Sequence, residues 1–103
     1  MEFDPEAIYN AELEAGYDAA DKDKAARLLE ENKSVVLADI MLDSPSSTNA
    51  AKEMEAKASK QFKEHLLQMC IARHEANRAE VKYKALIRLA DNRRTEAVNR
   101  RLS

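Results

Sequence analysis

The second half of the chain carries the longest regular pattern of apolar and polar positions. Between residues 50 and 101 there is no Gly or Pro, so no residue in this stretch interrupts an α-helix. Apolar residues recur there at spacings of four, three and seven, which is the period of one helix face. We therefore predict one long helix over residues 50–101. Its first apolar stripe consists of Phe62, Leu66, Met69, Ala76, Tyr83, Ile87, Ala90 and Ala97.

A second apolar stripe runs along the same predicted helix. Its members are Leu67, Ile71, His74, Val81, Ala85 and Leu89. Two stripes on one helix indicate that one face packs within an intrachain hairpin and that the other contacts a second subunit. Charged residues occupy three positions of the first register, so the predicted coiled coil is imperfect. The candidate self-association residues are Phe62, Leu66, Met69, Tyr83 and Ile87.

The first third of the chain predicts another helical arm, over residues 5–42. Asp4 and Pro5 form a typical helix start, because Asp caps free N–H groups and Pro lacks a donor that the first turn does not use. Gly16 lies inside this arm, where it costs about 1 kcal/mol relative to Ala. The arm therefore either bends or ends and restarts within residues 16–21, and both alternatives stay open.

Residues 43–49 form a loop between the two arms. Pro45 disfavours a helical conformation at the residue before it, and small polar residues surround it. A chain of 103 residues makes one domain at most, so the two arms fold back on one another. The predicted fold is a single all-α domain over residues 1–103. We expect a helical hairpin with a long C-terminal helix that is coiled-coil-like and self-associates.

The composition agrees with this fold class. One Gly and two Pro are too few turn residues for an all-β domain, and no glycine-rich loop is present to hold a phosphate. Apolar residues make up 45% of the chain, but 18 of them are Ala, so the core is thin and a partner is expected. No apolar run is long enough to span a membrane, and the lone Cys70 indicates a reducing, cytoplasmic compartment.

Charge is segregated along the chain, although the net charge is only −2. Residues 1–43 carry twelve acids and four bases, whereas residues 73–103 carry four acids and nine bases. One interpretation is that an acidic arm lies antiparallel to a basic arm, in the same or a neighbouring subunit, and each neutralises the other. The alternative is a basic helix that contacts phosphates. The candidate nucleic-acid-binding residues are Arg88, Arg93, Arg94, Arg100 and Arg101.

The acidic arm also carries a candidate surface for another protein. Tyr9, Leu13 and Tyr17 recur at every fourth position and therefore share one helix face. Phe3 belongs to the same group of residues amid acids. Exposed aromatic residues within a polar rim are typical of protein interfaces. Spaced carboxylates on a helix can also imitate a row of phosphates, so a DNA-binding enzyme is one candidate partner.

The sequence offers little for catalysis or metal binding. Cys70 and His74 are four residues apart and could reach one ion, but a structural zinc needs four ligands and a catalytic zinc needs three plus water. A helical hairpin without glycine turns has little means of building an oxyanion site. We therefore expect no catalytic residue, no metal and no cofactor, and we do not expect an enzyme.

About two-thirds of the chain resembles a group of small helical proteins of tailed phages and prophages. The resemblance rests on three features: residues 35–38 (VVLA) in a short helix, the polar turn, and a long helix with residues 79–86 (AEVKYKAL) and 93–96 (RRTE). Members of this group tend to be encoded beside single-strand-annealing recombinases and single-strand-binding proteins. The resemblance implies a phage accessory factor in the bacterial cytoplasm, acting on proteins of DNA metabolism or defence.

Three functions remain open from the sequence. The leading hypothesis is a non-enzymatic phage accessory protein that binds and modulates another protein of host or phage DNA metabolism or defence. Its contact surface would contain Tyr9, Leu13 and Tyr17. The first alternative is a nucleic-acid-binding recombination accessory factor that uses the basic C-terminal helix. The second is a structural or assembly oligomer. We expect a homodimer and no contact with a membrane.

Overall fold

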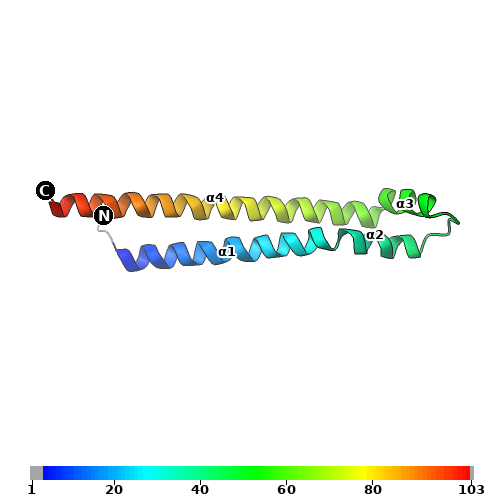
Figure 1. Ribbon diagram of the computed structural model, residues 1–103, viewed down its shortest axis with the longest axis horizontal. Coiled ribbons are helices and arrows are strands. Elements are labelled where there is room, and N and C mark those ends of the chain that lie inside the picture. Colours follow the sequence, from blue (N-terminus) through cyan, green and yellow to red (C-terminus); the bar gives the residue numbers. More distant parts are fainter. Residues whose placement is uncertain (1–3, 103) are drawn as a thin grey trace.

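A computed structural model describes residues 4–102. Within these residues the order of elements is α1 (Pro5–Glu31), α2 (Lys33–Leu42), α3 (Asn49–Ala58) and α4 (Lys60–Leu102). α1 and α2 form one arm, α3 and α4 return as the other, and α1 lies antiparallel to α4 (Figure 1). The predicted all-α helical hairpin with a long C-terminal helix is confirmed.

The hairpin has the shape of a rod. Its principal extents are 79 × 17 × 16 Å and its Cα radius of gyration is 22.6 Å, whereas a compact domain of this length has a radius of about 13 Å. The last turns of α4 extend past the start of α1 (Figure 1). Within the part of the chain that the structure describes, no helix is long and apolar enough to cross a membrane.

The fully buried positions between the two arms are mainly alanine. The buried apolar residues within 4–102 are Ala26, Ala56, Phe62, Ala76, Ala79 and Ala90. Alanine side chains let helix backbones approach closely, but each buries little apolar area. Among the described residues, thirteen large apolar side chains remain exposed. The hairpin therefore leaves a large part of its own apolar surface uncovered.

α1 begins where the sequence predicts it and continues without interruption. Asp4 caps the helix, with its Oδ1 accepting hydrogen bonds from two backbone N–H groups at 3.1 and 3.3 Å, and Pro5 occupies the first turn. The helix passes through Gly16, so the alternative of an end and restart within residues 16–21 does not occur. The first arm is interrupted later instead, at Asn32, which separates α1 from α2.

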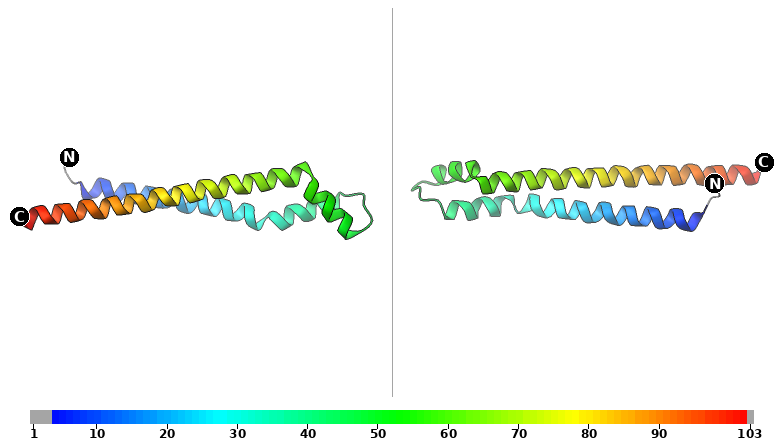
Figure 2. Two further views of the ribbon diagram at one scale, coloured as in Figure 1. Left: turned by 90° about the horizontal axis from the view of Figure 1, so that it is seen from above. Right: turned by 180° about the vertical axis from the view of Figure 1, so that it is seen from behind.

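The second arm is not the uninterrupted helix that we predicted over residues 50–101. It is divided at Ser59, whose backbone is extended (φ −69°, ψ 152°). The Ser59 hydroxyl donates to the carbonyl of Ala56 at 2.6 Å and accepts from the N–H of Phe62 at 3.2 Å. One side chain thus ends α3 and starts α4, and Figure 2 shows the two helices at an angle. The sequence prediction missed this break because it contains neither Gly nor Pro.

The connection between the arms matches the predicted loop, residues 43–49, to within one residue. The hydroxyls of Ser44 and Ser46 both donate to the carboxylate of Glu55, at 2.5 Å from Ser44. These hydrogen bonds hold the pKa of Glu55 below its ordinary value. Thr48 then caps α3 through its side chain. The loop is therefore tied to the helix that follows it.

Candidate interaction surfaces

The inner face of α4 consists of the residues that we assigned to self-association. The first of them is 3% exposed and the other four are half-buried. We correct the assignment, because in the folded hairpin these side chains pack in the seam within one chain. The stripe packs against the other arm of the same chain, because this contact does not require two molecules to associate. The corrected residues are Phe62, Leu66, Met69, Tyr83 and Ile87.

Gly16 packs against the ring of Tyr83 in this seam. A Cβ atom at Gly16 would lie 3.2 Å from both Cε1 and Cζ of Tyr83, which is closer than an ordinary van der Waals contact. The missing side chain therefore leaves room for the aromatic ring. This contact accounts for a glycine inside a continuous helix, since the ring packing offsets part of the low helix propensity.

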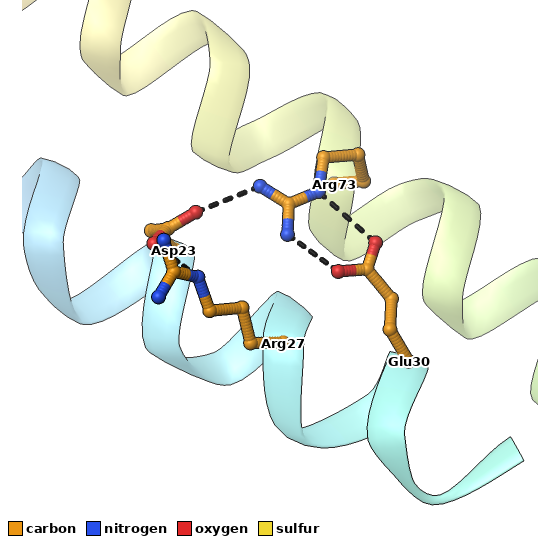
Figure 3. Close-up of polar contacts among 4 residues, drawn as sticks. All are labelled: Asp23, Arg27, Glu30 and Arg73. Atoms are coloured by element: carbon orange, nitrogen blue, oxygen red, sulfur yellow. Dashed lines mark hydrogen bonds and ion pairs between the residues drawn. The ribbon is translucent and has the colours of Figure 1, made fainter.

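Arg73 links the two arms near the middle of the rod (Figure 3). Its Nε and Nη2 donate to the two carboxylate oxygens of Glu30 at 3.1 and 2.5 Å, and its Nη1 donates to Asp23 at 2.8 Å. Arg27 adds a second cation beside Asp23 at 2.9 Å. The bidentate contact requires the planar guanidinium, so it orients the two helices as well as attracting them. We call these four residues the Arg73 cluster.

The Arg73 cluster holds its members in their charged forms. Hydrogen bonds from Arg73 lower the pKa of Asp23 and of Glu30, although desolvation opposes the shift at both carboxyls. The same hydrogen bonds raise the pKa of Arg73 above its ordinary value. The cluster is therefore an electrostatic link between the arms.

Some residues of the predicted basic surface contact the first arm of the hairpin, and the others face solvent. Arg94 donates to Glu12 of α1 at 2.8 Å and to Asp91 at 2.9 Å, and Arg93 is half-buried. Arg73 and Arg94 thus both pair with acids of the first arm, which agrees with the interpretation of an acidic arm against a basic arm. Arg94 is itself exposed despite these pairs, and the other exposed members of the predicted set are Arg88, Arg100 and Arg101.

The predicted protein-binding residues point away from the seam. Tyr9, Leu13 and Tyr17 are 58%, 39% and 62% exposed, and their spacing places them in one row along the outside of α1. We call them the aromatic row. Phe3, which we grouped with them, lies outside the described residues. Exposed carboxylates on the same half of α1 are Glu6, Glu14, Asp18 and Asp21.

The second apolar stripe of α4 also faces solvent. It lies on the outside of the helix, and its Leu89 end turns toward the edge of the seam. We call it the outer stripe. All six members are exposed: Leu67, Ile71, His74, Val81, Ala85 and Leu89. The contact within the hairpin therefore leaves this stripe open to another chain.

Two grooves follow the seam on opposite sides of the rod. One has a volume of about 340 Å³ and includes Gly16, Arg73 and Glu80 in its lining. The other has a volume of about 390 Å³, and Ala11 and Glu14 line it. Both grooves are shallow and open, and neither brings together a nucleophile and a base. The groove lined by Arg73 lies on the charged side of the rod, which carries the Arg73 cluster. The groove lined by Glu14 lies on the other side, which lacks this cluster.

The histidines and the cysteine do not converge. The Nε2–H of His65 donates to the carbonyl oxygen of Leu29 at 2.9 Å, which fixes its ring in the seam, while Cys70 and His74 are exposed. Within residues 4–102, no three His, Cys, Asp or Glu side chains are placed to hold one metal ion.

Sequence reasoning passed over two of the residues that organise these surfaces. It treated Arg73 as an interruption of the apolar register, although the charge segregation between the arms was a signal for such a pair. It treated Gly16 only as a helix breaker, because no local pattern connects it with Tyr83, 67 positions along the chain. A comparison of the chain with protein-family models, curated proteins and solved structures found no match.

Proposed function

We propose that the protein is a non-enzymatic accessory protein that binds another protein through the outside of α1 and modulates it. The aromatic row carries this proposal. Its three side chains are exposed on a capped helix whose opposite face is held by α4. Tyr residues presented on a rigid helix are frequent anchors of helix-in-groove interfaces.

The charge around the aromatic row supports a basic partner. Residues 5–21 contain five acids and no base, and four of those carboxylates are exposed on the same part of α1 as the row. Such a field attracts positive surfaces and accelerates association with them. Basic surfaces are typical of nucleic-acid-binding proteins, which supports a partner from host or phage DNA metabolism or defence. A homodimer in the cytoplasm belongs to the same proposal.

The proposal is tested by replacing the aromatic row in the full-length protein. The variant combines Tyr9→Gln, Leu13→Gln and Tyr17→Gln, since Gln keeps helix propensity and adds no charge. The matched control combines Met54→Gln and Val98→Gln, two exposed apolar residues elsewhere. Wild type and variants are immobilised and incubated with nuclease-treated bacterial lysate. Circular dichroism verifies that helix content is unchanged.

We expect wild type and control to retain a basic protein that the row variant loses. With that protein purified, the row variant should bind at least about tenfold more weakly, because each aromatic anchor contributes more than about 1 kcal/mol. The proposal is overturned if the row variant binds equally well. It is also overturned if the wild type instead binds a single-stranded oligonucleotide in a salt-sensitive way that depends on Arg88 and Arg101.

A further inference from the structure

The side of the hairpin away from the Arg73 cluster carries apolar side chains from both arms. Ala11 and Leu89 line one stretch of the groove on this side, and Ala11 and Glu14 line the next. Leu28 lies two heptads after Glu14 and therefore in the same row of α1. Leu28 and Leu89 are 54% and 48% exposed. Both arms thus contribute to one unpartnered apolar surface.

The outer stripe extends this surface toward the loop. Arg73 bonds to both Asp23 and Glu30, so it lies beside the stretch of α1 between them. Because the arms are antiparallel, Ile71 of the outer stripe lies at the same height along the rod as Leu28. The two residues come from different arms and are both about half exposed. The loop-proximal half of the rod therefore exposes apolar side chains on each arm at the same level.

Charge divides the rod into the same two halves. At the open end, residues 5–21 carry five acids and no base, while residues 82–101 beside them carry seven bases and two acids. At the loop end, residues 22–42 carry four of each, and residues 60–81 carry three acids and four bases. The open end is thus strongly charged with opposite signs on the two arms, and the loop end is nearly neutral.

We infer that a second copy of this chain covers this side of the hairpin, with the loops of both copies at the same end and α1 of each copy beside α4 of the other. The inference rests on the self-association included in the proposed function. In this arrangement the apolar loop ends meet each other, and the acidic end of each α1 meets a basic end of α4. With the loops at opposite ends, the apolar half of one copy would face the charged half of the other.

The dimensions of the hairpin suit such a dimer. A face of 79 × 17 Å exceeds the roughly 800 Å² that each partner contributes to a stable interface. Every helix of the first arm gains a second antiparallel neighbour, as in four-helix bundles, and antiparallel helix dipoles attract. The opposite side is less suited, because covering it would desolvate the charges of the Arg73 cluster. Two-fold symmetry makes the contacts reciprocal and closes the assembly at two copies.

The first test measures mass by light scattering over a hundredfold range of concentration. The dimer variant combines Ile71→Gln and Leu89→Gln, and the matched control combines Leu13→Gln and Tyr17→Gln in the aromatic row. We expect wild type and control to be dimeric and the dimer variant to dissociate at least about tenfold more easily. A monomeric wild type, a mass that keeps growing with concentration, or equal dissociation of both variants overturns the inference.

The second test measures the orientation of the two copies. Cys70, which is exposed, is replaced by Ala, and Ser47→Cys in the loop carries a spin label. Loops at one end give a label separation far below the 79 Å length of the rod, whereas loops at opposite ends give a separation near that length. A dimer with the long separation overturns the inference but keeps the self-association. Binding to another protein is judged separately by the aromatic row variant.

Discussion

Alanines at the most buried positions of a seam specify helix register poorly, because a shift by one heptad can place small residues against small residues again. In this hairpin a few individual residues set the register of the two arms. Arg73 requires carboxylates at two defined positions of α1, Asp23 and Glu30. The ring of Tyr83 requires a position without a large side chain, which Gly16 provides. These contacts select one alignment of the arms among several with similar apolar burial.

The Arg73 link predicts a pH-dependent contribution to stability. Since Arg73 lowers the pKa of Asp23 and Glu30 in the folded state, its stabilisation is present above their unfolded values, near 4, and is lost as the pH falls through the lower folded values. Arg73→Gln should therefore lower Tm at pH 7, and the difference from wild type should shrink below about pH 3. Thermal melts at both pH values at one protein concentration measure this.

Arg88→Gln is the control for this prediction, because Arg88 is an exposed arginine of the same helix. Its effect on Tm should be small at both pH values, as is usual for exposed charges. Equal melting of wild type and the Arg73→Gln variant at pH 7 would contradict a structural role for the cluster.

Gly16→Ala is predicted to stabilise the protein slightly. Alanine gains about 1 kcal/mol of helix propensity over glycine, while its Cβ would lie 3.2 Å from the ring of Tyr83. Tyr83 also lines the open groove of about 340 Å³, so its ring has room to move by a few tenths of an ångström. We expect a net gain of about 0.5 kcal/mol in the free energy of unfolding, measured by urea denaturation.

A larger side chain at the same position has no such room. Gly16→Leu should lower the free energy of unfolding by about 1–3 kcal/mol, because it displaces the ring entirely. If both variants are stabilised equally, Gly16 and Tyr83 are not packed as the structure has them.

At the scale of elements, each arm is interrupted by one residue, and neither interruption follows from the strongest breakers in the sequence. Gly16 lies within a continuous helix, whereas Asn32 and Ser59 separate helices. Asn and Ser side chains compete for backbone hydrogen bonds and are favoured at helix ends. At Ser59 this competition is visible, because its hydroxyl bonds to both neighbouring helices. Whether such a residue ends a helix depends on whether an uninterrupted helix would still pack against the other arm.

Ser59→Ala is predicted to weaken the junction between α3 and α4. It removes the hydrogen bond that the Ser59 hydroxyl accepts from the N–H of Phe62, and loss of such a cap costs about 1 kcal/mol. Ser47→Ala, in the exposed loop, is the control and should change stability by less than about 0.5 kcal/mol. Urea denaturation followed by circular dichroism measures both. An increase in stability with higher helix content would instead mean that the two helices fuse in the variant.

At the scale of the whole molecule, the rod combines a thin seam with strong charge segregation. Pro5–Leu42 holds nine acids and four bases, and Lys60–Leu102 holds five acids and eleven bases. Opposite net charges on adjacent antiparallel arms attract one another over the length of the rod. Because so few large side chains are buried, this attraction is a substantial part of what holds the arms together.

Salt should therefore destabilise the protein. Raising NaCl from about 0.02 M to about 0.5 M shortens the Debye length from about 20 Å to about 4 Å and screens the attraction between the arms. We expect Tm to fall over this range at constant protein concentration. A variant with Glu14→Gln and Asp21→Gln, which reduces the charge of α1, should show a smaller fall. A Tm that rises with salt would contradict this account and assign the stability to apolar burial instead.

The sequence by itself determined the fold class and the loop, and it indicated the opposition of an acidic and a basic arm as one of two interpretations. These follow from local physics: helix propensity, the apolar period, one proline-containing polar stretch and the order of charges. It also indicated the exposed aromatic row, because Tyr9, Leu13 and Tyr17 share a face with acids around them.

Only the tertiary structure decided which apolar stripe of α4 became the seam and which remained outside. Both stripes have the helical period, so the choice depends on how they fit the other arm. The inner stripe faces the other arm because, in that orientation, Arg73 pairs with Glu30 and Tyr83 packs on Gly16. These contacts join residues 43 and 67 positions apart, and no local pattern encodes such a match. The physical reason is that steric fit and charge pairing between the arms exist only after the chain has folded back on itself.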